Sequence, residues 1–269
     1  MIRVDVSSRK VLNTWFTEGA AGPSGGGIWG MGGLSVQPDG SALYTTTGNA
    51  LGKNEHLCYA EHVVRLGPAL KVLAANYPGL SGFDVDFGAT PLLYQPPGCP
   101  AQLAAMNKTG ALLIYGRDGI GSGPRQRLQM ANQALSEQGD FIGLPAYAPG
   151  LRLLYVNNPS DSSPGIYKHG LVALRVGTDC KLSRAWQRVV GSQATATTEY
   201  PSISPTVANG VVYVARSIDG VVYAFDAASG KQLWNSGSQI VGRILAGVTV
   251  ANGQLLVAST KGTLYAFAP

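Results

Sequence analysis

The chain has 269 residues, of which 45% are hydrophobic and only 13% charged, so we expect a sizeable core and not an intrinsically disordered chain. The 20 Lys and Arg residues outnumber the 15 Asp and Glu residues but form no basic run, so we expect no nucleic-acid partner. No apolar stretch is long enough to cross a bilayer, and residues 1–6 lack the regions of a signal peptide. We therefore expect neither a membrane-spanning segment nor a signal peptide in this chain.

Taken in chain order, the predicted elements are short β-strands separated by turn residues. Residues 2–6 and 11–16 form the first two, and five strand-rich segments follow. These segments run roughly over 33–79, 87–135, 141–191, 202–238 and 246–269. Each contains runs of β-branched and aromatic residues that end at Gly-containing turns such as Asn-Gly, Asp-Gly or Ser-Gly, which is typical of antiparallel strands.

An internal repeat indicates how these strands are organised. The segment Pro205–Gly210 (PTVANG) recurs 43 residues later as Val248–Gly253 (VTVANG), and similar strand and turn residues follow each copy. A period of 40–50 residues with about four strands per unit is typical of β-propeller blades. A helical repeat would need apolar residues at helical spacing, and a β-sandwich would not explain the repeat. We predict an all-β propeller of four-stranded blades.

The blade template covers the whole chain, residues 1–269, as a single propeller domain. It places about five blades and a partial one, because residues 2–16 look like the last two strands of a blade and the last blade lacks its outermost strand. Residues 11–16 could fill that place, since closing the ring hides exposed strand edges. The stronger expectation is that the chain is the C-terminal part of a seven- or eight-bladed propeller and lacks its first blades.

The stretch Gly220–Trp234 (GVVYAFDAASGKQLW) is the most specific copy of the repeat. It resembles the repeat of pyrroloquinoline quinone (PQQ) propellers, in which a strand ends in Ala-Phe-Asp and is followed by a Gly-Lys turn and a tryptophan. Residues 4–15 and 171–186 resemble it more loosely. The resemblance implies that Trp15, Trp186 and Trp234 pack between neighbouring blades. It also implies a periplasmic or extracellular location.

Three segments resemble the active-site blades of quinoprotein dehydrogenases more closely. They are residues 28–49, which begin with IWGMGG and end with YTTTGN, residues 83–91 (FDVDFGATP) and residues 106–118 (MNKTGALLIYGRD). In that family a dehydrogenase uses PQQ and Ca²⁺ to oxidise an alcohol or a sugar hydroxyl. The resemblance therefore implies these two cofactors and that class of small-molecule substrate.

The same resemblance implies a role for five residues. Asn49 would bind Ca²⁺ through its side-chain oxygen, a hard ligand for a hard cation. Asp84 would be the general base and a neighbour of the metal, with Asp86 as its partner or as the true base. Trp29 and Lys108 would contact the quinone. In a four-stranded blade the loops that carry Trp29, Asn49 and the two aspartates lie on one face, and Lys108 would reach the ligand from the side.

Several features leave a second class of function open. The family's adjacent Cys-Cys pair is absent, no Glu matches the family's metal ligand, and the stacking tryptophan of the family aligns nearer Met31 than Trp29. Asn49, Asp84 and Asp86 are also ordinary turn residues. The alternative is a propeller without cofactor, which binds a protein partner or acts as a scaffold of the bacterial envelope.

The chain has three widely spaced cysteines, Cys58, Cys99 and Cys180, which form no CxxC motif. This excludes zinc ribbons and thioredoxin-like chemistry. Cys99 is expected between strands one and two of one blade, and Cys180 between strands three and four of the next. Both loops would lie on the face opposite Asn49. A disulfide between them is possible outside the cytoplasm, although the radial offset of an inner and an outer loop argues against it.

Overall fold

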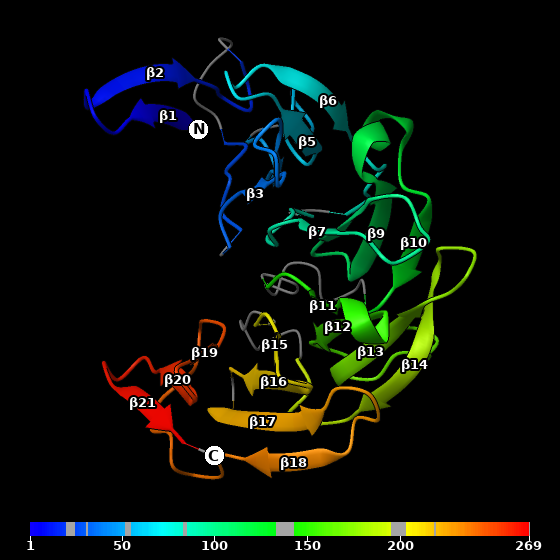
Figure 1. Ribbon diagram of the computed structural model, residues 1–269. Helices are drawn as coiled ribbons and strands as arrows, with labels where there is room; N and C mark the ends of the chain where they lie inside the picture. Colours follow the sequence, from blue (N-terminus) through cyan, green and yellow to red (C-terminus); the bar gives the residue numbers. More distant parts are fainter. Residues whose placement is uncertain are drawn as a thin grey trace.

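The computed structural model describes residues 1–19, 25–30, 32–51, 55–82, 85–132, 143–194, 203–217 and 219–268. In these residues the chain forms short antiparallel strands that make six separate sheets. The sheets follow one another along an open arc, with the first sheet at one end and the last at the other (Figure 1). This is the predicted all-β propeller arrangement.

Four of the sheets contain four strands, and each strand pairs with its neighbour along the chain. The first is β3 (Ser35–Val36), β4 (Leu43–Thr46), β5 (Val63–Leu66) and β6 (Val72–Asn76). The second is β7 (Leu92–Tyr94), β8 (Gln102–Met106), β9 (Ala111–Gly116) and β10 (Gln126–Gln129). The third is β11 (Ala146–Ala148), β12 (Leu153–Asn158), β13 (Gly170–Val176) and β14 (Leu182–Arg188), and the fourth is β15 (Thr206–Ala208), β16 (Val211–Arg216), β17 (Val221–Asp226) and β18 (Gln232–Asn235). All lie within the predicted blade segments.

The two sheets at the ends of the arc are smaller. One consists of β1 (Ile2–Asp5) and β2 (Lys10–Thr14), and the other of β19 (Thr249–Ala251), β20 (Gln254–Ala258) and β21 (Leu264–Phe267). Within the described residues β2 pairs with β1, and β21 pairs with β20. Among these residues β2 therefore does not complete the last blade, because the sheet of β19, β20 and β21 contains no strand from residues 11–16.

The core consists of apolar layers between consecutive sheets. On β8, Leu103 and Ala105 point into the layer shared with the sheet before it, whereas Ala104 and Met106 point into the layer shared with the sheet after it. All four are buried. Side chains alternate between the two faces of a strand, and here both faces are covered. This explains why the central strands read as continuous apolar runs.

Tryptophans join neighbouring sheets, as the resemblance implies. Trp186 on β14 lies against Gly230 in the β17–β18 turn, where a Cβ atom would come within 2.6 Å of its ring. Gly230 also has a φ of +69°, which favours glycine for a second reason. Trp234 on β18 packs against Phe267 on β21, with ring centroids 5.1 Å apart. The glycine and the tryptophan of the repeat are thus packing partners across sheets.

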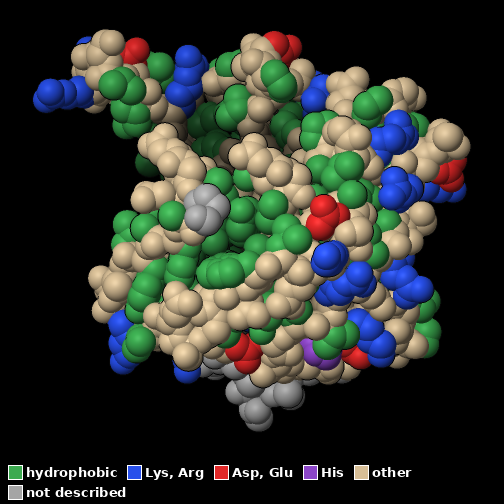
Figure 2. Space-filling view, turned by 60° about the horizontal axis from the view of Figure 1, so that its bottom comes forward, with side chains coloured by type: hydrophobic (Ala, Val, Ile, Leu, Met, Phe, Trp, Pro, Cys, Tyr) green, Lys and Arg blue, Asp and Glu red, His purple; other side chains and the backbone are tan. Residues whose placement is uncertain are grey.

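Charged side chains are dispersed on the surface. On the face drawn in Figure 2, Lys and Arg side chains lie in several separate groups toward the edge, while hydrophobic side chains occupy much of the middle. This agrees with the absence of a basic run in the sequence. Among the described residues no helix has the length and apolar character needed to cross a membrane.

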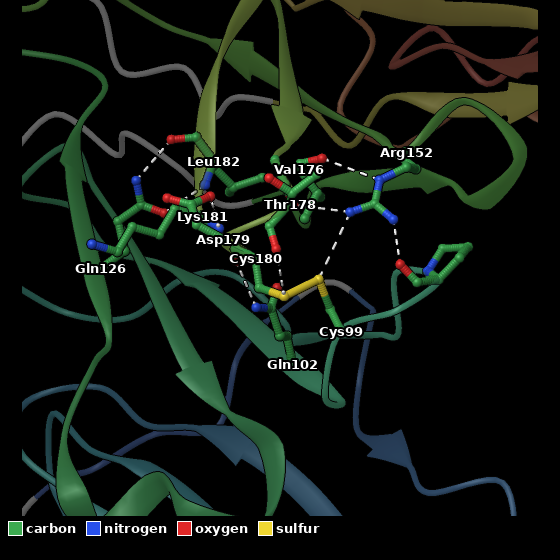
Figure 3. The surroundings of a disulfide bond; sticks show 12 residues. Cys99, Gln102, Gln126, Arg152, Val176, Thr178, Asp179, Cys180, Lys181 and Leu182 are labelled. Atoms are coloured by element: carbon green, nitrogen blue, oxygen red, sulfur yellow. Dashed lines mark hydrogen bonds between the residues drawn. A yellow bond between two sulfur atoms is a disulfide. The ribbon is translucent and has the colours of Figure 1, made fainter.

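Cys99 and Cys180 form a disulfide, with their Cα atoms 5.7 Å apart (Figure 3). Cys99 lies between β7 and β8, and Cys180 between β13 and β14, so the bond joins two consecutive sheets. The expected radial offset does not keep them apart, because the two loops are held together by hydrogen bonds. Gln102 Nε2 donates to the carbonyl of Cys180 at 2.8 Å, and the guanidinium of Arg152 donates to the carbonyls of Pro97 and Gly177.

A buried arginine ties the third sheet to the fourth. Arg216, at the end of β16, is only 6% exposed, and its Nη1 donates to Asn157 Oδ1 at 2.9 Å and to the carbonyl of Asn158 at 3.2 Å.

Replacing Arg216 by Met is expected to lower the free energy of unfolding by about 2 kcal/mol, because buried acceptors lose their donor. Urea denaturation would measure this. The control is Arg184→Met, on the exposed side of β14, which should change the free energy of unfolding by less than about 0.5 kcal/mol.

Candidate functional site

Three of the predicted site residues meet where the first two four-stranded sheets adjoin. Asn49 follows β4, Asp86 precedes β7, and Lys108 lies in the turn between β8 and β9. Lys108 Nζ is 3.2 Å from Asp86 Oδ2, and Asp86 Oδ1 accepts a hydrogen bond from the backbone N–H of Asn49. Residues that are 22 to 59 positions apart in the sequence therefore form one polar cluster.

The ion pair in this cluster is buried. Asp86 is 6% exposed and Lys108 is 7% exposed. The backbone N–H of Lys108 also donates to the carbonyl of Asp86 at 3.0 Å. Charges are buried in proteins when they are paired and hydrogen-bonded, and removing one partner of such a pair is strongly destabilising. The contact between Lys108 and Asp86 is thus a fixed feature of this face.

Trp29 is the fourth member of the cluster, and glycines make room for it. The ammonium of Lys108 lies 5.2 Å from the centroid of its ring, within the range of a cation–π interaction. A Cβ atom at Gly48 would lie 3.0 Å from Trp29 Nε1 and 3.1 Å from Asp86 Oδ1. A Cβ atom at Gly88 would come within 2.6 Å of the indole ring. The two glycines therefore allow the ring to lie close to Asp86 and Lys108.

Asp84 and Met31 lie outside the described residues, so their places in the site are not described. The structure brings together the other four predicted residues, namely Trp29, Asn49, Asp86 and Lys108. They come from two consecutive sheets, as expected for loops that share one face of a propeller.

Sequence reasoning missed a buried glutamate beside this cluster. Glu61 is fully buried, and its backbone N–H donates to the carbonyl of Gly48 at 2.9 Å. Its Oε2 contacts Nδ1 of His56, while its Oε1 has no hydrogen-bond partner among the described residues. His56 Nε2 lies 3.0 Å from the hydroxyl of Tyr77. No motif marks Glu61, because a glutamate in a polar loop normally faces solvent.

Glu61 gives the protein a predicted pH dependence. Burial raises the pKa of its carboxyl to about 7, against 4.5 for an ordinary glutamate. The folded state therefore holds a proton that the unfolded state releases between these values, and Glu61 makes stability fall as pH rises toward 7. Between about pH 5 and pH 8, the Tm of wild type is expected to fall relative to that of Glu61→Gln. Differential scanning calorimetry measures both Tm values, and an equal change of Tm with pH in the two proteins would contradict this prediction.

The chemistry of the cluster fits a hard cation and an anionic, planar ligand. Asp86 and Asn49 carry oxygen atoms of the kind that Ca²⁺ prefers, although the Asp86 carboxylate already contacts Lys108 and the backbone N–H of Asn49. Lys108 supplies a positive charge, and Trp29 an aromatic ring next to it. In the part of the chain that the structure describes, no three His, Cys, Asp or Glu side chains converge as a metal site. A Ca²⁺ site here would need Asn49 and Asp84 as ligands.

Comparisons with known proteins relate the chain to propellers of two kinds. Residues 218–269 match the family model PQQ_2, described as outer membrane protein assembly factor BamB. Among solved structures, BamB from Moraxella catarrhalis is 12% identical, with a TM-score of 0.54, over 87% of this chain and 56% of that chain. A europium-containing methanol dehydrogenase is 16% identical, with a TM-score of 0.60, over 90% of this chain and 50% of that one. No curated protein sequence matches the chain.

A third similar structure comes from a eukaryote. Sqt1 from Saccharomyces cerevisiae is 12% identical, with a TM-score of 0.62, over 99% of this chain and 65% of that chain. The chain thus spans about half to two thirds of the length of these structures, and identities this low establish the fold and not the activity. The chain thus has the β-propeller fold of these structures, and its residues 218–269 match the PQQ_2 family model.

Proposed function

We propose that the chain is part of a quinoprotein dehydrogenase that binds PQQ and Ca²⁺ and oxidises an alcohol or a sugar hydroxyl. The supporting observation is the contact of Asn49, Asp86 and Lys108, which the resemblance to that family implies and which are far apart in the sequence. In this proposal residues 1–269 act as one propeller domain. The protein works in the periplasm or outside the cell, where a disulfide such as Cys99–Cys180 persists.

Each side chain has a defined task in the proposed reaction. Asn49 and Asp84 hold Ca²⁺ through their side-chain oxygens. Trp29 and Lys108 hold the quinone, and Asp86 keeps the ammonium of Lys108 in place. When bound, PQQ supplies the acceptor for the hydride that leaves the alcohol carbon. The hydroxyl proton needs a base within about 3 Å.

We assign that base to Asp84 rather than Asp86. Both oxygens of the Asp86 carboxylate are already engaged, one by Lys108 Nζ and the other by the N–H of Asn49. A carboxylate held in this way is a poor acceptor for the substrate proton. Asp84 is two positions before Asp86, the spacing at which side chains of an extended segment share one face. Asp84 then takes the proton, and the substrate leaves as a carbonyl compound.

The second candidate is a propeller without cofactor that binds another protein. One observation favours it: the family model that matches residues 218–269 is that of an assembly factor and not of an enzyme. In that case the pair of Lys108 and Asp86 has a structural role.

Binding of PQQ distinguishes the two candidates. The full chain is incubated with PQQ and Ca²⁺, freed of unbound quinone, and examined for quinone absorbance and for quenching of tryptophan fluorescence. Dye reduction is then measured with a panel of alcohols and sugars. A dehydrogenase retains the quinone in a Ca²⁺-dependent manner, and Lys108→Met weakens that retention. Failure of the wild-type protein to retain PQQ would leave the protein-binding propeller as the function.

A further inference from the structure

We propose that Asn107 is a positioning residue that holds Asp86 in the orientation the site requires. This inference rests on the proposed function for its significance, but its geometry is independent of any cofactor. Asn107 is fully buried and directly precedes Lys108 in the turn after β8. No motif in the sequence assigns it a role.

The side-chain amide of Asn107 joins this turn to the segment that carries Asp86. Its Nδ2 donates to the carbonyl of Asp86 at 2.8 Å and also to the carbonyl of Val85. Its Oδ1 accepts a hydrogen bond from the backbone N–H of Thr109 at 2.8 Å. Both halves of the amide are therefore used, one to shape the turn and the other to bind the segment of Asp86.

The turn after β8 contacts both the main chain and the side chain of Asp86. The carbonyl of Asp86 accepts from Asn107 Nδ2 and from the backbone N–H of Lys108, while its carboxylate contacts Lys108 Nζ. With its main chain and its side chain both held by residues 107 and 108, Asp86 has little freedom to rotate. Its other carboxylate oxygen accepts from the N–H of Asn49, so the position of Asp86 also sets that of the expected Ca²⁺ ligand.

Only an amide of this length meets these requirements. Aspartate has nearly the same shape but no donor, so it would leave the carbonyls of Val85 and Asp86 without the bonds from residue 107. It would also add a negative charge next to a buried carboxylate. Asn107→Asp is therefore a near-isosteric change that removes the donor and adds a charge, as Asn158→Asp does elsewhere.

The next blade supplies a matched control. Asn158, at the end of β12, is also fully buried, and its Nδ2 donates to the carbonyls of Met130, Ser160 and Lys168. β12 is the second strand of its sheet, as β8 is of its own. None of these carbonyls belongs to a predicted site residue. Asn158→Asp thus removes a comparable set of hydrogen bonds away from Asp86.

The test compares wild type, Asn107→Asp and Asn158→Asp in the full chain. Amide hydrogen exchange at Asn49, followed by NMR, reports the bond from its N–H to Asp86 without any cofactor. Ca²⁺ affinity, measured by calorimetry, reports the expected site. Asn107→Asp should speed exchange at Asn49 about tenfold and weaken Ca²⁺ binding about 10- to 100-fold. Asn158→Asp should lower the Tm about as much as Asn107→Asp does, and it should leave amide exchange at Asn49 and Ca²⁺ affinity as in wild type.

The outcomes separate this inference from the proposed function. If wild type binds neither Ca²⁺ nor PQQ but Asn107→Asp still speeds exchange at Asn49, the dehydrogenase fails and the positioning role stands. If wild type binds both and Asn107→Asp leaves exchange and affinity unchanged, the positioning role is overturned. Should Asn107→Asp fail to fold, Asn107→Ser, which keeps one donor on a shorter side chain, is measured at lower temperature with the same criteria.

Discussion

Replacing Asp84 by Asn is expected to lower the turnover of the PQQ- and Ca²⁺-loaded protein by about 10²–10⁴-fold while leaving PQQ retention close to wild type. Asparagine keeps an oxygen that can bind the cation, but it cannot accept the hydroxyl proton of the substrate. The loss should therefore appear in kcat more than in KM. Steady-state dye reduction with the best alcohol from the panel measures it, and retained quinone absorbance measures binding.

Asp86→Asn is the matched control for this variant. It removes the negative partner of Lys108, whose ammonium is buried, so it should destabilise the protein by about 3 kcal/mol and disturb quinone retention as well. Asp84→Asn should show the kinetic defect with an unchanged Tm. Wild-type turnover in Asp84→Asn, or loss of its fold, would show that Asp84 is a turn residue and not a base.

The fold was predictable because its signals are local and repeated. The recurrence of PTVANG as VTVANG, and the Gly-containing turns between strands, specify the blade length without any knowledge of contacts. Continuous apolar strands such as β8 follow from burial on both faces, with Leu103 and Met106 in different layers. The alternative pairing of residues 11–16 with the last blade is not observed in the described residues, where β1 and β2 form a sheet apart from that of β19 to β21.

The site was predictable only in part. Asn49, Asp86 and Lys108 were predicted because they stand in motifs, and the structure places Asp86 in contact with the other two, while their roles stay predictions. Glu61 and Asn107 were missed, although Asn107 directly precedes Lys108. Their roles depend on the carbonyls and side chains that surround them in the folded chain, and a buried glutamate or asparagine has no sequence pattern of its own.

The disulfide also could not be predicted from sequence patterns alone. Strand order placed Cys99 and Cys180 on the same face of consecutive blades, but in an inner and an outer loop whose offset argued against a bond. The hydrogen bonds that draw them together come from Gln102 and Arg152, which carry no motif (Figure 3). Pairing of cysteines in different blades is decided by such loop contacts.

Replacing Cys180 by Ser is expected to lower the free energy of unfolding by about 4 kcal/mol. The bond closes a loop with a sequence separation of 81 residues, so its removal restores much conformational freedom to the unfolded chain. It also unlinks two consecutive sheets, and their shared apolar layer must then hold them without a covalent bond. Chemical denaturation under non-reducing conditions measures the change.

Cys58→Ser is the control, because Cys58 is exposed and forms no disulfide. Its stability should stay within about 0.5 kcal/mol of wild type, and it removes the free thiol that could exchange with the bond. In the Cys58→Ser background, a reductant should lower stability to the level of Cys180→Ser and should have no further effect on the double variant. If the reductant leaves the Cys58→Ser protein as stable as before, Cys99 and Cys180 do not pair in solution, and their shared apolar layer and hydrogen bonds such as those of Gln102 and Gln126 hold the two sheets together.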